Sequence, residues 1–220
     1  KSGLKFGEVY PSLQYLNLPN LCYVSDINYD DLDLIFCALP HTKSAAIINK
    51  LPRNIKIIDL SADFRLNTDS LYKKWYGVDH PCPDLLSKFI YGLTEFYRTD
   101  IKNSDYVACT GCNSATGLYP IIPLVSEGII EFNDIIINLA TGVSGAGRKA
   151  NEFIIHSEVS EGFSPYNVRS HRHLAEFDQE LLKFSGKKIR VTFTLMPPSA
   201  SSLHARRPST VQGTLIVATL

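Results

Sequence analysis

One cysteine of the chain stands where a thiol could act as a nucleophile. Residues 105 to 120 read DYVACTGCNSATGLYP, in which an apolar run leads to Thr110-Gly111-Cys112 and then to small polar residues that can open a helix. Unpaired N–H groups and aligned peptide dipoles at a helix amino end favour negative charge, so a cysteine there is readily held as the reactive thiolate. Gly111 would allow the tight turn from strand to helix. The segment predicts a nucleophile at Cys112, against the plain alternative of a small, half-buried residue.

A second segment, RSHRHLAEFDQE at residues 169 to 180, gathers groups that could move a proton. His171 and His173 point to the same side of an extended chain, and Glu176 follows one helical turn beyond His173. Histidine gives and takes a proton near neutrality without extensive tuning of its pKa. The alternative is a solvated helix start, at which Glu176 favours the positive end of the helix dipole.

Two further segments could hold an anionic ligand. LATGVSGAGRKA (139 to 150) runs from a strand into glycines, a serine and Arg148, whose guanidinium could hold a carboxylate or phosphate bidentately. DLSADFR (59 to 65) places Arg65 just beyond the end of a strand. A plain loop and a paired surface arginine are the respective alternatives.

The composition favours small-molecule chemistry. The 220 residues are 45% hydrophobic, and Lys plus Arg and Asp plus Glu number 22 each, so no excess positive charge attracts nucleic acid or an anionic membrane. No apolar run approaches the roughly 20 residues that span a bilayer. We therefore expect a soluble, cytoplasmic protein with no nucleic-acid or membrane partner.

The cysteines are expected to be reduced. Five of them cannot all pair, and their spacing does not suggest a disulfide framework. Cys109 and Cys112 form a CxxC, yet no second CxxC or nearby histidine pair completes a metal set. We expect no metal site, and we expect Cys109, inside an apolar run, to belong to the core.

The elements that must position these groups fall into two parts. In the first half, residues 21–25, 34–39 and 55–60 have the pattern of buried strands, and residues 43–51 that of a short helix. This alternation is typical of a parallel sheet with crossover helices, in which ligands lie beyond the carboxyl ends of the strands. The tripeptide LPH at residues 39–41 lies at one such end.

Beyond residue 110 the pattern changes. Residues 134–140, 188–195 and 214–218 are expected to form a mostly antiparallel sheet. Residues 174–184 carry apolar side chains at helical spacing, which predicts a helix packed on that sheet.

The predicted fold class is α/β. It comprises a partial Rossmann-like parallel sheet domain at residues 1–109 and an α+β catalytic domain, with a mostly antiparallel sheet, at residues 110–220. A nucleotide-binding sheet normally begins with a strand, a glycine-rich turn and a helix that holds the phosphates. Because no such turn precedes residue 110, we expect the chain to lack the first part of this domain.

Taken in order, seven motifs resemble those of the N-acetyl-gamma-glutamyl-phosphate reductase family of semialdehyde dehydrogenases. They cover most of residues 8 to 196 and are EVYPSL (8–13), LIFCALPH (34–41), IIDLSADFRL (57–66), YGLTE (91–95), Gly111-Cys112, TGVSGAGR (141–148) and HRHLAEFDQEL (171–181). The resemblance implies an NADP-dependent reductase of arginine biosynthesis that acts on a small-molecule acyl phosphate. It also implies a homodimer or homotetramer.

The resemblance assigns roles to particular residues. Cys112 would displace phosphate from the acyl phosphate to form a thioester, which a hydride from NADPH then reduces to the aldehyde. His173 is the implied general acid/base. The other implied residues are Arg65, Arg148, His171 and Glu176 on the substrate side and Pro40, His41, Ser144 and Gly145 on the cofactor side.

The chain also departs from the family pattern. Thr110 replaces the usual proline, and Asn113-Ser114-Ala115-Thr116 follows the cysteine, as in the branch that reduces carrier-linked aminoadipyl phosphate in lysine synthesis. Residues 197 to 220 keep little of the family's closing segment, and its glycine-rich opening would lie upstream of Lys1, so the resemblance implies truncation at both ends. The alternatives are that related reductase, a non-catalytic remnant, and a hydrolase that uses the same cysteine and histidine.

Overall fold

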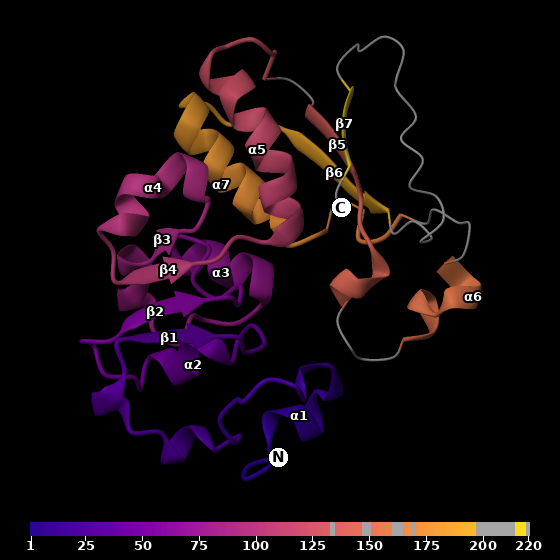
Figure 1. Cartoon of the computed structure of the whole chain (residues 1–220). Helices are drawn as coiled ribbons and strands as arrows, with labels where there is room; N and C mark the ends of the chain where they lie inside the picture. The colour runs from indigo at the N-terminus through magenta and orange to yellow at the C-terminus, as the bar shows by residue number, and fades with distance from the viewer. Residues whose placement is uncertain (133–134, 147–150, 160–164, 169, 197–213, 219–220) are drawn as a thin grey trace.

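Two small β-sheets organise the chain, one before and one after residue 110 (Figure 1). The computed structural model describes all residues except 133–134, 147–150, 160–164, 169, 197–213 and 219–220. No helix within these described residues combines the length and the apolar character needed to cross a membrane.

The first sheet is parallel throughout, as predicted. Its strand order is β1-β2-β4-β3, and each neighbouring pair runs in parallel. The strands are β1 (Leu34–Cys37), β2 (Lys56–Asp59), β3 (Ile90–Tyr91) and β4 (Tyr106–Ala108). The helices of this part are α1 (Phe6–Val9), α2 (Ser44–Ile48), α3 (Asp69–Tyr76) and α4 (Thr94–Lys102). Because parallel strands end at one edge, the loops after β1, β2 and β4 meet there.

The strand predicted at residues 21–25 is wrong. This segment contains a 3-10 turn at Val24–Asp26, and Tyr23 and Val24 are 63% and 48% exposed. The backbone N–H of Leu21 donates to the carbonyl of Leu4 at 2.9 Å, in a loop rather than in a strand ladder. An apolar run becomes a strand only where a neighbouring strand and a core receive it.

Two long helices lie beside the second sheet (Figure 1). α5 (Cys112–Ser126) and α7 (His173–Ser185) pack along each other, and the sheet has the order β6-β5-β7. Its strands are β5 (Ile135–Ala140), β6 (Val191–Met196) and β7 (Thr214–Ala218), and the short α6 (His156–Val159) lies between β5 and α7 in the sequence. The predicted helical stripe is confirmed, because Leu174, Phe177 and Leu181 are buried against α5 in one core.

The direction of the second sheet corrects the prediction. β5 pairs with both β6 and β7 in parallel, not in antiparallel fashion. Side chains of β5 alternate between buried and less buried, a pattern usual for antiparallel strands with one solvated face. Here the helices α5 and α7 cover one face of the sheet, so the alternation reports one-sided burial rather than strand direction.

A buried carboxylate fixes the loop that follows β1. Asp63 accepts hydrogen bonds from the backbone N–H groups of Thr42 (2.6 Å) and Ala45 (2.9 Å) and from the Tyr72 hydroxyl (2.9 Å). Thr42 has a φ of 67°, in the left-handed region that costs an L-residue about 1–2 kcal/mol. The carboxylate therefore holds a strained residue in place, and with it the neighbouring His41 at the carboxyl edge of the sheet.

Candidate active site

The predicted nucleophile begins a long helix. Cys112 is the first residue of α5 and carries an exposed, free thiol. Gly111 is the N-cap, with extended backbone angles (φ −64°, ψ 138°) that turn the chain from β4 into the helix. The thiol therefore lies at a helix amino end, as the sequence predicted.

A buried glutamate, Glu176, is hydrogen-bonded to the turn that carries Cys112. Oε2 of Glu176 accepts hydrogen bonds from the backbone N–H of Gly111 at 3.0 Å and from the Tyr91 hydroxyl at 2.6 Å. Its other oxygen, Oε1, lies 3.5 Å from a guanidinium nitrogen of Arg65. Burial and the nearby Glu176 carboxylate raise the pKa of Tyr91 well above its ordinary value, so this hydroxyl remains a donor. Glu176 is only 2% exposed, and its hydrogen bonds are made within the protein.

The imidazole of His173 packs against the same turn. A Cβ built on Gly111 would lie 2.5 Å from Nε2 of His173, so only glycine lets the turn and the ring approach so closely. Nε2 also lies 3.9 Å from Oε1 of Glu176. Burial lowers the pKa of His173, and the Glu176 carboxylate offsets part of this effect. His173 is therefore neutral near pH 7 and able to accept a proton.

His171 stands beside His173. The ring centroids of the two residues are 4.4 Å apart, and Nδ1 of His171 accepts a hydrogen bond from the backbone N–H of His173 at 3.2 Å. Burial, and then the neighbouring imidazole of His173, lower the pKa of His171 to about 4. Since Nδ1 is the acceptor, the neutral ring carries its proton on Nε2.

Arg65 is largely engaged by the protein itself. Its Nε donates to the carbonyl of Cys109 at 2.7 Å, and a terminal nitrogen donates to the carbonyl of Leu60 at 3.3 Å. Together with the ion pair to Glu176, these bonds connect the end of β2, the turn after β4 and α7. The side chain still lines a cavity, so a role in ligand binding stays a prediction.

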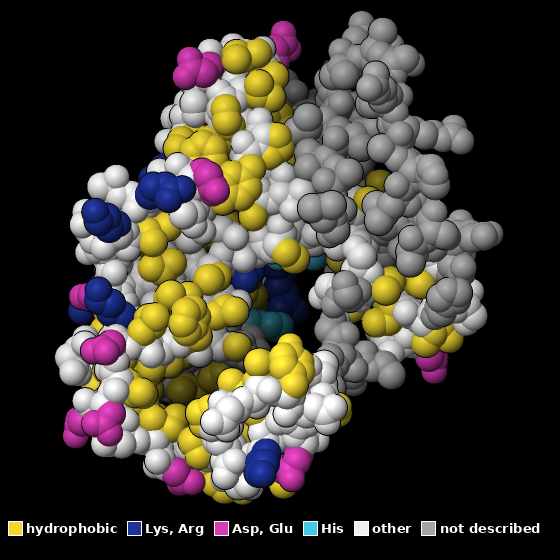
Figure 2. All heavy atoms as spheres, viewed as in Figure 1, with side chains coloured by type: hydrophobic (Ala, Val, Ile, Leu, Met, Phe, Trp, Pro, Cys, Tyr) yellow, Lys and Arg dark blue, Asp and Glu magenta, His cyan; other side chains and the backbone are white. Residues whose placement is uncertain are grey.

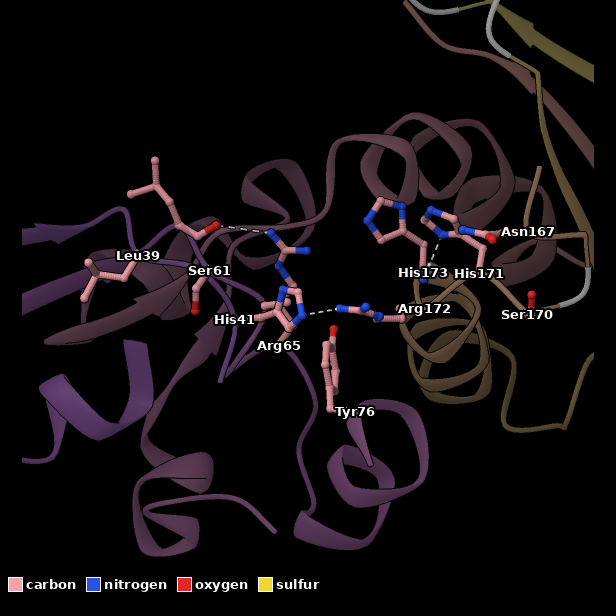
Figure 3. A pocket seen from close by; sticks show the side chains of 12 residues that line it. Leu39, His41, Ser61, Arg65, Tyr76, Asn167, Ser170, His171, Arg172 and His173 are labelled. Atoms are coloured by element: carbon pink, nitrogen blue, oxygen red, sulfur yellow. Dashed lines mark hydrogen bonds between the residues drawn. The ribbon is translucent and has the colours of Figure 1, made fainter. Parts of the chain in front are cut away.

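A cavity of about 610 Å³ lies at the carboxyl edge of the first sheet, and we call it cavity A (Figure 3). Figure 2 shows histidine and basic side chains at the bottom of a hollow on the viewed face of the molecule. The polar and aromatic residues of cavity A are His41, Ser61, Arg65, Tyr76, Asn167, Ser170, His171, Arg172 and His173. Four residues predicted from three separate motifs, His41, Arg65, His171 and His173, thus line one cavity.

Arg172 and Tyr76, which had no assigned role in the sequence prediction, meet in cavity A. The guanidinium of Arg172 lies 5.3 Å from the centre of the Tyr76 ring, and one of its nitrogens contacts Nε2 of His41 (Figure 3). Arg172 belongs to the polar segment that the sequence drew attention to, whereas Tyr76 ends α3 in an unremarked helix. The contact between Arg172 and Tyr76 is recognised only in the structure, where the end of α3 lies near the start of α7.

A second cavity, of about 720 Å³, lies on the Cys112 side, and we call it cavity B. It is lined by Cys112, Asn113, Thr141, Gly142, Val143, Gly145, Ala146, Asn151, Phe153, Ile154, Glu158, Val159, Pro165, Tyr166 and Asn167. Asn167 lines both cavities, so the two sites adjoin. Gly145, predicted on the cofactor side, thus lines the same cavity as Cys112.

Of the remaining predicted residues, Pro40 and Ser144 lie in turns. The carbonyl of Pro40 accepts hydrogen bonds from the N–H groups of Lys43 (3.1 Å) and Ser44 (3.3 Å), which closes the turn that presents His41. Ser144 belongs to a 3-10 turn at Val143–Ala146, and Arg148 lies outside the described residues.

Comparison with known proteins matches both parts of the chain. The NAD binding domain of semialdehyde dehydrogenases matches residues 1–104, and their dimerisation domain matches residues 112–201. N-acetyl-gamma-glutamyl-phosphate reductases are among the relatives. That of Cereibacter sphaeroides (strain ATCC 17025) is 50% identical over 195 residues, 88% of this chain and 57% of the relative. That of Rhodobacter capsulatus is 49% identical over 200 residues, 90% of this chain and 58% of the relative. That of a Jannaschia species is 49% identical over 195 residues, 88% of this chain and 57% of the relative.

The chain spans 57–58% of the length of these relatives. The two family matches meet at the turn that carries Cys112, because one ends at residue 104 and the other begins at residue 112. The sequence motifs, the parallel sheet and these matches lead to one conclusion: the chain belongs to the semialdehyde dehydrogenase family, among whose members the N-acetyl-gamma-glutamyl-phosphate reductases resemble it at about half of the aligned positions.

Proposed function

We propose that the protein catalyses the NADPH-dependent reduction of N-acetyl-gamma-glutamyl phosphate to N-acetylglutamate 5-semialdehyde. The observation that carries this proposal is the contact between the Gly111-Cys112 turn and the His173 imidazole. Cys112 begins α5 at this turn, and a thiol served by a neutral base is the arrangement that covalent acyl transfer requires. The choice of substrate and reaction follows the names of the relatives that are about 50% identical to the chain.

The first step forms a covalent bond to Cys112. The thiolate attacks the acyl carbon, the new carbon–sulfur bond forms, and the bond from that carbon to the phosphate oxygen breaks, so that inorganic phosphate leaves. Cavity B, which Cys112 lines, is the proposed place of the acyl chain. No redox change occurs in this step, because the thioester has the oxidation level of the acyl phosphate.

The second step releases the aldehyde. NADPH, when bound, supplies the hydride that brings the acyl carbon to the aldehyde oxidation level. The carbon–sulfur bond then breaks, and the electron pair returns to the sulfur of Cys112. His173, which is neutral near pH 7, exchanges the proton with the thiol and with the oxygen of the intermediate.

Cavity A fits part of the nucleotide. It lies beyond the carboxyl ends of β1 and β2, where parallel sheets bind their ligands, and its lining is largely polar. His41 and the turn at Pro40 would hold the cofactor in cavity A, and Ser144 and Gly145 would hold it in the adjoining cavity B, which Gly145 lines. We further propose that Arg148 meets an anionic group of the substrate, and that the part matched by the dimerisation domain forms a homo-oligomer.

Glu176 is better suited to positioning than to binding substrate. Its carboxylate is buried and bonded to the Gly111 turn and to Tyr91, with Arg65 as its ionic partner. We propose that it fixes the position of the Gly111-Cys112 turn relative to the imidazole of His173. His171, whose ring borders cavity A, remains the proposed substrate contact of this pair.

The decisive experiment is substitution of the nucleophile. Phosphate-dependent reduction of NADP with N-acetylglutamate semialdehyde would be measured for wild type, Cys112→Ser and Cys22→Ser, the last an exposed cysteine outside both cavities. We expect a loss of about three orders of magnitude or more for Cys112→Ser, because a nucleophile acts as part of a unit, and none for Cys22→Ser. Full rate in Cys112→Ser would refute the mechanism.

Three outcomes would favour the alternatives. Preference for a carrier-linked aminoadipyl semialdehyde over the acetylglutamate substrate would indicate the lysine-branch reductase, in line with Asn113 after the cysteine. Absence of saturable NADPH binding in a fluorescence titration would indicate a non-catalytic remnant. Ester hydrolysis without nucleotide, lost in Cys112→Ser, would indicate a cysteine hydrolase.

A further inference from the structure

One cation of cavity A has no carboxylate partner among the described residues. Arg172 precedes the first residue of α7, and its guanidinium extends toward His41 above the ring of Tyr76 (Figure 3). The ion pairs found in the described part of the chain join Arg65, Lys73 and His173 to acidic residues, but not Arg172. No aspartate or glutamate is among the described residues that line cavity A.

The two arginines of cavity A therefore differ. Arg65 is surrounded by two carbonyl oxygens and the Glu176 carboxylate, so its charge is balanced within the protein. Within the described part of the chain, the contacts of Arg172 are an imidazole and an aromatic face. A guanidinium in such a setting keeps its full positive charge available for a ligand.

The contacts of Arg172 fix its position without neutralising it. Arginine can only donate, so Nε2 of His41 must accept, and the imidazole is neutral in this arrangement. The Tyr76 ring supports the guanidinium from below through a cation–π contact. The side chain thus crosses from the second part of the chain to the first, a sequence distance of 131 residues between Arg172 and His41.

We propose that Arg172 is the phosphate-binding residue of cavity A. Its planar fork of N–H donors matches the oxygens of a phosphate group, which can accept two parallel hydrogen bonds from it. The phosphate comes from one of two sources: the group that leaves the acyl phosphate, or a phosphate of the nucleotide. The choice between them rests on the proposed function, whereas the binding of the anion itself does not.

The first arm of the test measures binding without turnover. The full chain would be titrated with inorganic phosphate at low ionic strength by isothermal calorimetry, as wild type, Arg172→Gln, Arg172→Lys and Arg98→Gln. Arg98 is an exposed arginine of α4 outside cavity A and serves as the matched control. We expect the dissociation constant to rise about tenfold or more in Arg172→Gln, less in Arg172→Lys, which keeps the charge but not the fork, and not at all in Arg98→Gln.

The second arm identifies the source. A higher KM for phosphate in the aldehyde-oxidising direction, with unchanged NADPH affinity, assigns the site to the acyl phosphate. Weaker NADPH binding with an unchanged KM for phosphate assigns it to the nucleotide. Unaltered phosphate binding in both Arg172 variants would overturn the proposal. If Cys112→Ser kept full rate while Arg172→Gln lost phosphate, the anion site would stand and only the proposed reaction would fall.

Discussion

The backbone N–H of Gly111 donates a hydrogen bond to Oε2 of Glu176 at 3.0 Å, across 65 residues of chain. This bond ties the start of α5, which carries Cys112, to α7, which carries His173. Glu176 lies three residues beyond His173, one turn along α7, so one carboxylate reaches both the turn and the imidazole. The relative position of the Cys112 turn and His173 thus depends on a hydrogen bond that the backbone of Gly111 donates, not on a side chain of the turn.

A methyl group at Gly111 should therefore disturb catalysis more than folding. In Gly111→Ala the new Cβ would meet Nε2 of His173 at 2.5 Å and Oε1 of Glu176 at 2.8 Å, so both side chains must move. We expect kcat to fall about 100-fold, as a displacement of the order of 1 Å can cause, with a loss of about 1–3 kcal/mol in the free energy of unfolding. Steady-state kinetics and urea denaturation would measure the two effects.

Gly117→Ala is the control for packing between the same two helices. Its Cβ would meet Cζ of Phe177 at 2.5 Å, in the core and away from His173. Unfolding free energy should fall by a similar amount while kcat stays near the wild-type value. If both variants lost kcat equally, the rate loss would come from general repacking of α5 and α7 rather than from the contact at Gly111.

Replacing Glu176 with glutamine should lower both the stability of the protein and its rate. In Glu176→Gln, the partly buried Arg65 loses its carboxylate, and we expect the free energy of unfolding to fall by about 3 kcal/mol. The turn and His173 also lose their common partner, so kcat should fall. Glu180→Gln is matched to it: Glu180 is likewise 2% exposed and accepts from a tyrosine hydroxyl, that of Tyr97. This control should lose stability but keep its rate, and a normal kcat in Glu176→Gln would contradict the positioning role.

The first sheet was predictable because the short apolar runs and their order along the chain both indicated parallel strands. Short apolar runs separated by a helix leave few arrangements other than parallel strands, and β1, α2 and β2 lie within their predicted ranges. The second sheet shows where such reasoning fails. Alternating burial in β5 arises because helices cover one face, and a linear pattern cannot distinguish this from an antiparallel partner.

The site was predictable only where its residues share a segment. His171, His173 and Glu176 lie within six residues, so their motif revealed them together. The Tyr91 hydroxyl, which donates to Glu176, lies 85 residues away in the two-residue strand β3. Tyr91 opens the motif YGLTE, but the motif does not indicate which residue its hydroxyl would contact. Tyr76 was missed for the same reason, since only tertiary structure brings the end of α3 beneath Arg172.

The buried carboxylate after β2 offers a test of loop positioning. Asp63 accepts from two backbone N–H groups and a hydroxyl, so in Asp63→Asn an amide NH₂ would have to face donors. We expect a loss of about 1–3 kcal/mol for each donor left without an acceptor, and a higher KM for the nucleotide because the His41 loop is released. Asp79→Asn, which removes an exposed ion pair to Lys73, should change stability by less than about 1 kcal/mol. An unchanged KM in Asp63→Asn would show that the loop keeps its place without this carboxylate.

The histidine pair predicts how stability depends on pH. The pKa of His171 is about 4 in the folded protein and 6.5 in its ordinary state, so between these values the unfolded chain binds more protons than the native one. Stability is therefore complete above pH 6.5 and falls as the pH drops toward 4, by about 3 kcal/mol at about 1.4 kcal/mol per pKa unit. His173 and His80 have lowered pKa values and add slopes of the same sign.

The variant His171→Gln isolates the contribution of one ring. Urea denaturation of wild type and variant from pH 4 to pH 8 should give unfolding free energies whose difference is constant above pH 6.5, because His171 is neutral in both states there. Below pH 6.5 the wild type should lose stability more steeply than the variant. Parallel stability curves across this range would mean that His171 is not held neutral by its surroundings.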